Sequence, residues 1–234
     1  MGDLLKGISN FRGAVFPGHS ALYRKLAREG QQPHALMISC ADSRVMPETI
    51  TQSGPGDLFV CRNAGNIVPP FSTLNGGVSS AIEYAILALG VSDIVVCGHS
   101  DCGAMKGLCR PEMLEPMPNV AAWLRHSHAA FSIVCQAYPD DLSEAERVRA
   151  VGMENVVVQL DHLKTHPSVA AKLATNEITL HGWFFDIETG EVQVYDGALA
   201  SFTEVQEGEA LPVAFTGRNH PHVMPRVSAT LAGE

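Results

Sequence analysis

An amphipathic helix that runs directly into an apolar strand constrains the fold of this chain more than any other feature. From Val78 to Leu89 the apolar residues recur at intervals of three and four, the period of a helix with one buried face, and Gly90 follows as a stop signal. Residues 94–97, "IVVC", then form a continuous apolar run, which is typical of a parallel strand covered on both faces. This succession is typical of a βαβ unit, so we expect an α/β fold.

The remaining segments extend this pattern into a mostly parallel central sheet of four to five strands flanked by helices. The other elements that we expect are a helix ending at Gly30, strands at residues 34–40 and 57–66, and an antiparallel hairpin at one edge of the sheet around residues 188–191. Two helices are expected in the middle of the chain, separated near residues 138–146. Within this segment Ser143 and Glu146 can form a capping box. Pro167 fits the first position of a further helix.

The whole chain, residues 1–234, is expected to form a single domain, because 46% apolar residues suffice for a sizeable core. Within it we expect an N-terminal helical arm over about residues 1–33 and a C-terminal extension over about residues 198–234. The sequence contains no evident internal repeat, low-complexity tract or linker.

Charge and cysteine usage narrow the class of protein. The formal net charge of −9, with no run of Lys and Arg, argues against nucleic acid or an anionic membrane as partner, since both require a basic patch. The N-terminal segment has no apolar core or cleavage motif of a signal peptide, and no membrane span is evident. Six cysteines are too sparse for a disulfide scaffold. We therefore expect a cytoplasmic protein with a small-molecule partner.

Two cysteines and a histidine lie at the ends of predicted strands. Cys40 ends the strand at residues 34–40, and His99 and Cys102 follow the apolar run at 94–97. The carboxyl ends of adjacent parallel strands meet at one edge of a sheet, so these three side chains can converge there. Two thiolates and an imidazole are suited to tetrahedral Zn²⁺, and three protein ligands leave the open position typical of a catalytic zinc.

An aspartate and an arginine accompany the first cysteine. In an extended segment Cys40, Asp42 and Arg44 point to the same side. Arg44 can therefore hold Asp42 through a two-pronged ion pair that keeps the carboxylate ionised and aimed. Asp42 could serve as a fourth zinc ligand or accept a hydrogen bond from a hydroxide on the metal.

Three motifs together resemble a known family. The stretches "CADSRV", "RNAGN" and "GHSDCG" look like those of β-class carbonic anhydrase, and the resemblance extends from about Gly18 to about Gly197. It implies a zinc enzyme that interconverts CO₂ and bicarbonate by means of a zinc-bound hydroxide, built as a dimer, tetramer or other even homo-oligomer. By motif match, the zinc ligands would be Cys40, His99 and Cys102, and the catalytic dyad would be Asp42 and Arg44.

The resemblance also assigns a substrate pocket and suggests a branch of the family. In the plant-like branch a glutamine, a phenylalanine and a tyrosine line the pocket, often across the subunit interface, and the matching residues here are Gln31, Phe59 and Tyr84. Another branch binds an inhibitory bicarbonate through a tryptophan, an arginine and a tyrosine. The matching positions are Met37, Arg62 and Phe185, so that only the arginine is present. We therefore expect no regulatory bicarbonate site and a zinc that is open to water near neutral pH.

Other functions fit the same residues less completely. Hydrolysis of carbonyl sulfide or carbon disulfide would use the same zinc chemistry with a different access path. A non-catalytic zinc or redox-responsive protein could pair Cys40 with Cys102, although such a protein gives Asp42 and Arg44 no task. A zinc nucleobase deaminase requires a Glu two residues after the His, where Asp101 stands, and a C-x-x-C pair that the chain lacks. The other four cysteines are interpreted as structural.

Overall fold

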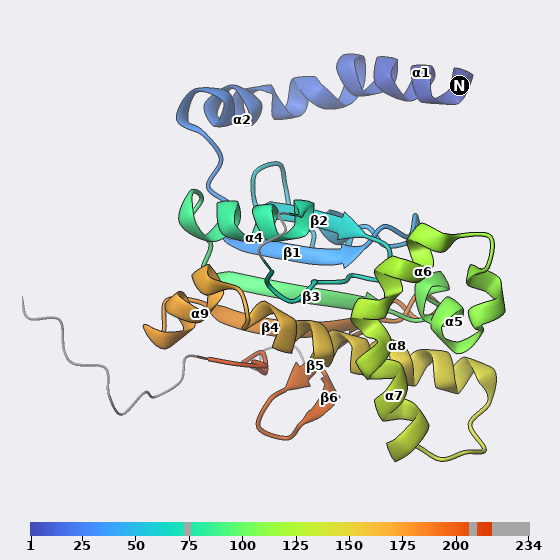
Figure 1. The fold of residues 1–234 in the computed structure, drawn as a ribbon. Coiled ribbons are helices and arrows are strands. Elements are labelled where there is room, and N and C mark those ends of the chain that lie inside the picture. The colour runs from blue at the N-terminus through green and yellow to red at the C-terminus, as the bar shows by residue number, and fades with distance from the viewer. Residues whose placement is uncertain (73–75, 206–209, 217–234) are drawn as a thin grey trace, which may run out of the picture.

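A six-stranded sheet forms the centre of the protein, whose computed structural model describes residues 1–72, 76–205 and 210–216 (Figure 1). The strands are β1 (Ala35–Cys40), β2 (Leu58–Asn63), β3 (Asp93–His99), β4 (Thr179–Phe185), β5 (Val192–Asp196) and β6 (Ser201–Glu204), in the order β2-β1-β3-β4-β5-β6. The first four pair in parallel, and β5 and β6 pair antiparallel. The expected parallel sheet with an antiparallel hairpin at one edge is confirmed. The expected number of four to five strands is too low, because a sixth strand, β6, is supplied by the C-terminal extension, whose residues beyond 216 lie outside the described residues.

Helices connect the strands and precede them. The α-helices are α1 (Gly2–Asn10), α2 (Phe16–Glu29), α3 (Pro47–Ile50), α4 (Gly77–Leu87), α5 (Gly103–Cys109), α6 (Pro118–Leu124), α7 (His128–Ala137), α8 (Glu144–Leu163) and α9 (Pro167–Ala174). A π-helical turn, Phe11–Val15, joins α1 to α2, and 3₁₀ turns occur at Pro111–Leu114 and Arg125–Ser127. No helix within the described residues is long and apolar enough to cross a membrane.

The predicted helix boundaries hold where the sequence carries a specific capping signal. Ser143 and Glu146 form the expected capping box at the start of α8, and Pro167 occupies the beginning of α9. The single helix expected before residue 138 is wrong, because it is divided into α6 and α7. At the break, Gln159 Nε2 donates to the carbonyl oxygen of His126 at 3.3 Å, a contact from another helix that the local sequence does not reveal.

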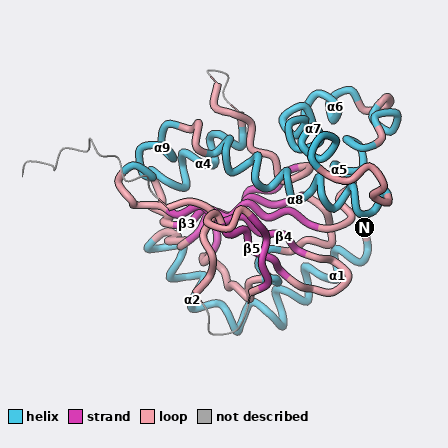
Figure 2. Tube along the Cα trace, turned by 90° about the horizontal axis from the view of Figure 1, so that it is seen from below, coloured by secondary structure: helices cyan, strands magenta, loops and turns pink. Residues whose placement is uncertain are grey.

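One face of the sheet carries the main core. Alternate residues of β1 and β3, such as Leu36, Ile38 and Ile94, pack under α4, α8 and α9 and are fully buried. Figure 2 shows these three helices on the same side of the strands. Phe184 of β4 closes the core against α8, where Gly152 gives its ring room.

The opposite face of the sheet carries a smaller apolar cluster. Met37, Val95 and Cys97 are buried there, and Val60, Trp183 and Phe185 pack around them while remaining partly exposed. The indole Nε1 of Trp183 is buried, with no hydrogen-bond partner among the described residues. In the described part of the chain, α4, α8 and α9 all pack on the face with the main core and not on this one.

The N-terminal arm, residues 2–29, lies outside the sheet and its helical layer and contacts the rest of the chain near its C-terminal end, where Leu26 lies against Gly56. It runs past the β2 edge in Figure 1, and Figure 2 places it on the side of the sheet opposite α4, α8 and α9. None of the residues of α1 or α2 is buried. Five apolar side chains in the first half of the arm are 41% to 68% exposed, namely Leu4, Leu5, Ile8, Phe11 and Val15. Their spacing of three to four residues places them on one helix face.

Candidate metal centre and active site

The carboxyl ends of β1 and β3 bring two cysteines and a histidine together. Cys40 is the last residue of β1, His99 the last of β3, and Cys102 immediately precedes α5. Their Sγ and ring nitrogen atoms all lie within 4.8 Å of one another, and all three residues are buried. The adjacent parallel strands end at the same edge, with Ser39 paired to Cys97, which accounts for the convergence.

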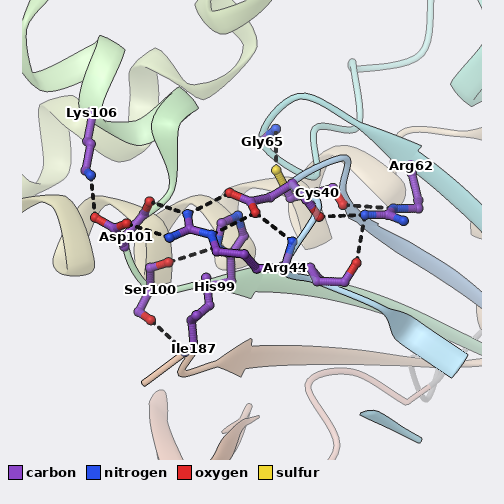
Figure 3. A network of polar contacts seen from close by, with 11 residues as sticks. Cys40, Arg44, Arg62, Gly65, His99, Ser100, Asp101, Lys106 and Ile187 are labelled. Atoms are coloured by element: carbon purple, nitrogen blue, oxygen red, sulfur yellow. Dashed lines mark hydrogen bonds and ion pairs between the residues drawn. The ribbon is translucent and has the colours of Figure 1, made fainter. Parts of the chain in front are cut away.

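The imidazole of His99 is oriented by its own loop. Its Nδ1 lies 2.8 Å from the carbonyl oxygen of Ser100, so this nitrogen carries the proton and donates it (Figure 3). Ser100 is fixed in turn, because its backbone N–H donates to Phe185 and its hydroxyl oxygen accepts from the N–H of Ile187, both at 2.9 Å. The other ring nitrogen, Nε2, is buried and has no hydrogen-bond partner among the described residues. Its lone pair is therefore available to a metal.

The two thiols share a proton unequally. Its surroundings lower the pKa of Cys40 to about 4, and the largest cause is a hydrogen bond from Cys102, with a smaller contribution from the backbone N–H of Gly65. The same pairing, together with burial, raises the pKa of Cys102 well above its ordinary value. A divalent cation would take the place of the proton between the two sulfur atoms and stabilise both as thiolates.

Gly65 supports the site through its backbone. Its N–H donates to Cys40 Sγ at 3.4 Å, and its φ of +83° lies in the left-handed region that favours glycine. A Cβ here would also lie 3.1 Å from the side chains of Ala104 and Met105. Asn63 holds the loop, because its side chain accepts from the N–H of Ile67 and donates to the Ile67 carbonyl oxygen. The sequence signal for this support is "RNAGN".

The donor set fits zinc. Two thiolates and an imidazole nitrogen are soft and borderline ligands, and three of them leave one tetrahedral position for a water or substrate. The unpaired, buried Nε2 of His99 is the observation that favours a metal over a hydrogen-bonded core cluster.

Asp42 is held beside this cluster by Arg44. Arg44 Nε donates to Asp42 Oδ1 at 3.0 Å, its Nη2 donates to Oδ2 at 2.8 Å, and its backbone N–H adds a third bond at 3.0 Å. These hydrogen bonds hold the pKa of Asp42 well below its usual range. The two-pronged pair expected from the sequence therefore exists, and the carboxylate is ionised at neutral pH.

Two charged residues near the site were not singled out by the sequence. Asp101 and Lys106 lie on the second motif loop and on α5, and Asp101 contacts Arg44 (Figure 3). The separation of 57 residues between Arg44 and Asp101 hides this pairing from any local pattern.

The predicted pocket residues lie away from the cluster of their own chain. The rings of Phe59 and Tyr84 pack with centroids 5.9 Å apart, and Tyr84 is 51% exposed. Phe59 pairs with Leu36, whereas Cys40 pairs with Asn63, so Phe59 lies about 13 Å along the sheet from Cys40. Gln31 is exposed and precedes β1, at the same distant end.

The residues that match the regulatory bicarbonate site have other contacts. Met37 is 1% exposed within the smaller apolar cluster, which Phe185 also borders. Arg62 Nη2 donates to the carbonyl oxygens of Asp42 and Val45, both at 2.7 Å, and its Nε donates to that of Cys40 at 3.1 Å. The arginine is therefore used to hold the backbone of the first motif loop.

Fold and site together define an α/β protein in which two cysteines and a histidine form a group that could hold a metal ion. Comparison with known families agrees, because the carbonic anhydrase family model matches residues 35–192. The chain belongs to the carbonic anhydrase family, and its likeness to solved structures places it in the β class.

Relatives and solved structures cover most of the chain. A carbonic anhydrase of Pseudomonas aeruginosa is 47% identical over 88% of this chain and 93% of its own length. One of Synechocystis is 45% identical over 88% of this chain and 75% of its own. The structure of the β-carbonic anhydrase CcaA has a TM-score of 0.86 at 43% identity, covering 92% of this chain and 94% of that one. A structure described as a tetrameric β-carbonic anhydrase of Sordaria macrospora has a TM-score of 0.72 at 31% identity, covering 86% and 96%.

Proposed function

We propose that this protein catalyses the reversible hydration of CO₂ to bicarbonate and a proton, with zinc bound by Cys40, His99 and Cys102. The observation that carries the proposal is the ionised carboxylate of Asp42, fixed by Arg44 beside a buried three-donor cluster. A purely structural zinc would have a fourth cysteine or histidine and no need of an aimed carboxylate.

Each protein group has a defined task in this reaction. When bound, zinc would act as a Lewis acid, which in favourable sites lowers the pKa of water from about 15.7 to about 7. Asp42 accepts a hydrogen bond from the attacking oxygen at Oδ, so that the lone pair of that oxygen faces CO₂. Arg44 keeps the carboxylate ionised and fixes its direction. Because two thiolate ligands place negative charge on the metal, activity rises toward alkaline pH.

We propose that the substrate pocket is completed by a second copy of the chain. Gln31, Phe59 and Tyr84 lie at the end of the sheet away from their own cluster, and Tyr84 is exposed. They would supply a donor and an apolar wall to the partner's site, an environment that a neutral gas prefers to water. The tetrameric Sordaria macrospora structure supports a homo-oligomer, either dimer or tetramer.

The arm supports the same assembly. None of the described residues buries its exposed apolar stripe, and the face with Val60, Trp183 and Phe185 is partly exposed as well. Apolar surfaces of this kind mark protein interfaces. We propose that the arm packs on a second copy, as part of one domain spanning residues 1–234 in a cytoplasmic protein.

We further propose the plant-like, non-regulated branch of the family for this enzyme. The arginine that would bind inhibitory bicarbonate is engaged with three carbonyl oxygens, and Met37 and Phe185 offer no hydrogen-bond donor to an anion.

The test is to measure turnover of CO₂ and of carbonyl sulfide side by side on zinc-loaded and zinc-depleted protein. The proposal requires rapid CO₂ hydration that depends on zinc. Turnover of carbonyl sulfide but not of CO₂ would show that the protein is a carbonyl sulfide hydrolase. No turnover of either substrate at one zinc per chain would favour a non-catalytic zinc or redox-responsive role.

A further inference from the structure

Arg44 is held by two aspartates from two different loops. Beyond the two bonds from its side chain to Asp42, its Nη1 donates to Asp101 Oδ2 at 2.8 Å, and its Nη2 donates to the carbonyl oxygen of Asp101 at 3.3 Å. Figure 3 shows Arg44 reaching Asp101, whose other carboxylate oxygen faces Lys106. Asp42 follows the strand that carries Cys40, and Asp101 follows the strand that carries His99. The guanidinium therefore links the two loops that hold the site.

The backbone of Asp101 is shaped for this contact. Its φ of +57° lies in the left-handed region, where aspartate and asparagine are tolerated far better than most residues. In this conformation both its carbonyl oxygen and its carboxylate reach Arg44. The residue directly precedes Cys102, so the same turn positions a metal ligand and a partner for the arginine.

Without the Asp101 side chain, Nη1 of Arg44 would lose its carboxylate acceptor. The Arg44 side chain is 45% exposed, and an exposed guanidinium with a free Nη1 can choose other rotamers. Isolated exposed ion pairs contribute little to stability. Here, however, Asp42 and Asp101 share one guanidinium, which is two-pronged at Asp42, and Asp101 also pairs with Lys106. Such a network restricts orientation more than any single pair.

We propose that Asp101 is a positioning residue that acts through Arg44 to keep the carboxylate of Asp42 aimed for reaction and off the metal. Asp101 touches neither the three predicted ligand atoms nor, by this account, the substrate. This inference rests on the proposed CO₂ hydration for its kinetic effect, but its effect on the metal's surroundings does not require turnover.

The test compares Asp101→Asn in two backgrounds, the wild-type protein and Asp42→Asn. Asparagine keeps the left-handed backbone and one acceptor but removes the charge. Asp161→Asn is the matched control, because Asp161 is an exposed aspartate of α8 with one partner, Lys164. The readouts are the visible absorption spectrum of the fully cobalt-loaded proteins and, separately, kcat and KM for CO₂ of the zinc-loaded proteins.

In the wild-type background, Asp101→Asn is expected to change the cobalt spectrum and to lower kcat about 10-fold with little change in KM, since a small misplacement of a catalytic group is costly. In the Asp42→Asn background it should change neither, because its effect passes through Asp42. Asp101→Gly, which fits the backbone and has no side-chain acceptor, should give the larger effect.

Three results would overturn the inference. The first is a cobalt spectrum and kcat of Asp101→Asn that match those of Asp161→Asn. The second is an equal loss of kcat on Asp101→Asn in the wild-type and Asp42→Asn backgrounds. The third is a smaller effect of Asp101→Gly than of Asp101→Asn. If no variant or wild-type protein turns over CO₂ while the spectra still follow the expected pattern, then the proposed function fails and the positioning role stands.

Discussion

The guanidinium of Arg62 donates to the carbonyl oxygen of Asp42 at 2.7 Å, so an arginine of β2 fixes the backbone of the loop whose side chain performs the proposed chemistry. The same side chain also holds the carbonyl oxygens of Cys40 and Val45. A charged donor thus serves three backbone acceptors of one loop, one of which, the Asp42 carbonyl oxygen, also accepts from the N–H of Val45 at 3.0 Å.

Replacing this arginine should destabilise the protein. Arg62→Met keeps most of the side-chain length but removes all three hydrogen bonds, and we expect it to lower the free energy of unfolding by about 2 kcal/mol. Arg147→Met is the control, because Arg147 donates to one exposed carbonyl oxygen, that of Asp140, and should cost less than about 0.5 kcal/mol. Urea denaturation of the metal-free proteins measures the difference. Equal losses in the two variants would show that the loop contacts of Arg62 contribute nothing particular.

Bicarbonate should inhibit the enzyme only as a product. Arg62 is engaged with the backbone and Met37 is buried, so no preformed anion site exists among these residues. Initial rates of CO₂ hydration at constant ionic strength should fall hyperbolically with bicarbonate concentration. A steep, sigmoidal fall would indicate a regulatory site that this account excludes.

Metal binding should depend on Cys40, His99 and Cys102. Cys102→Ala is expected to weaken zinc binding by more than about 100-fold, because even residues that only orient metal ligands contribute 10-fold to 100-fold. Cys135→Ala, at an exposed cysteine of α7, should leave zinc binding unchanged. Zinc per chain after dialysis against a chelator series gives both values. Retention of a full equivalent of zinc by Cys102→Ala under conditions that strip none from the control would contradict the ligand assignment.

The assembly should depend on the apolar face of the arm. The double variant Leu5→Asp and Ile8→Asp places charges on the exposed stripe and should weaken self-association by at least about 100-fold, given about 2 kcal/mol for each buried side chain. Lys6→Asp adds a negative charge to the same helix at a residue outside the stripe and should have little effect. Sedimentation velocity over a range of concentrations distinguishes them. An unchanged oligomer in the double variant would show that the arm is not at the interface.

The sequence predicts the parts of this protein that depend on local patterns. Cys40 and His99 could be assigned to strand ends because β1 and β3 are continuous apolar runs, and the capping box at Ser143 identified the start of α8. The parallel direction of these strands then follows from the helices that connect them.

What the sequence does not predict depends on contacts between distant residues. The pairing of Arg44 with Asp101 requires two loops to meet, and the positive φ of Asp101 has no sequence signal of its own beyond tolerance for that conformation. The division of α6 from α7 depends on a contact from Gln159, and the distance of Phe59 from Cys40 follows from strand register. Tertiary packing decides each of these features.

The most direct test of the central claim is stopped-flow CO₂ hydration by zinc-loaded protein between about pH 6.5 and pH 9, the range around the pKa of about 7 that zinc can give water. Hydrogen bonds from Arg44 keep the pKa of Asp42 far below this range, so the carboxylate stays ionised throughout and cannot cause the pH dependence. We expect kcat to rise with pH in the wild-type protein and to be at least about 100-fold lower in Asp42→Asn at full zinc content. Turnover in Asp42→Asn equal to that of the wild-type protein, or none in either at one zinc per chain, would contradict it.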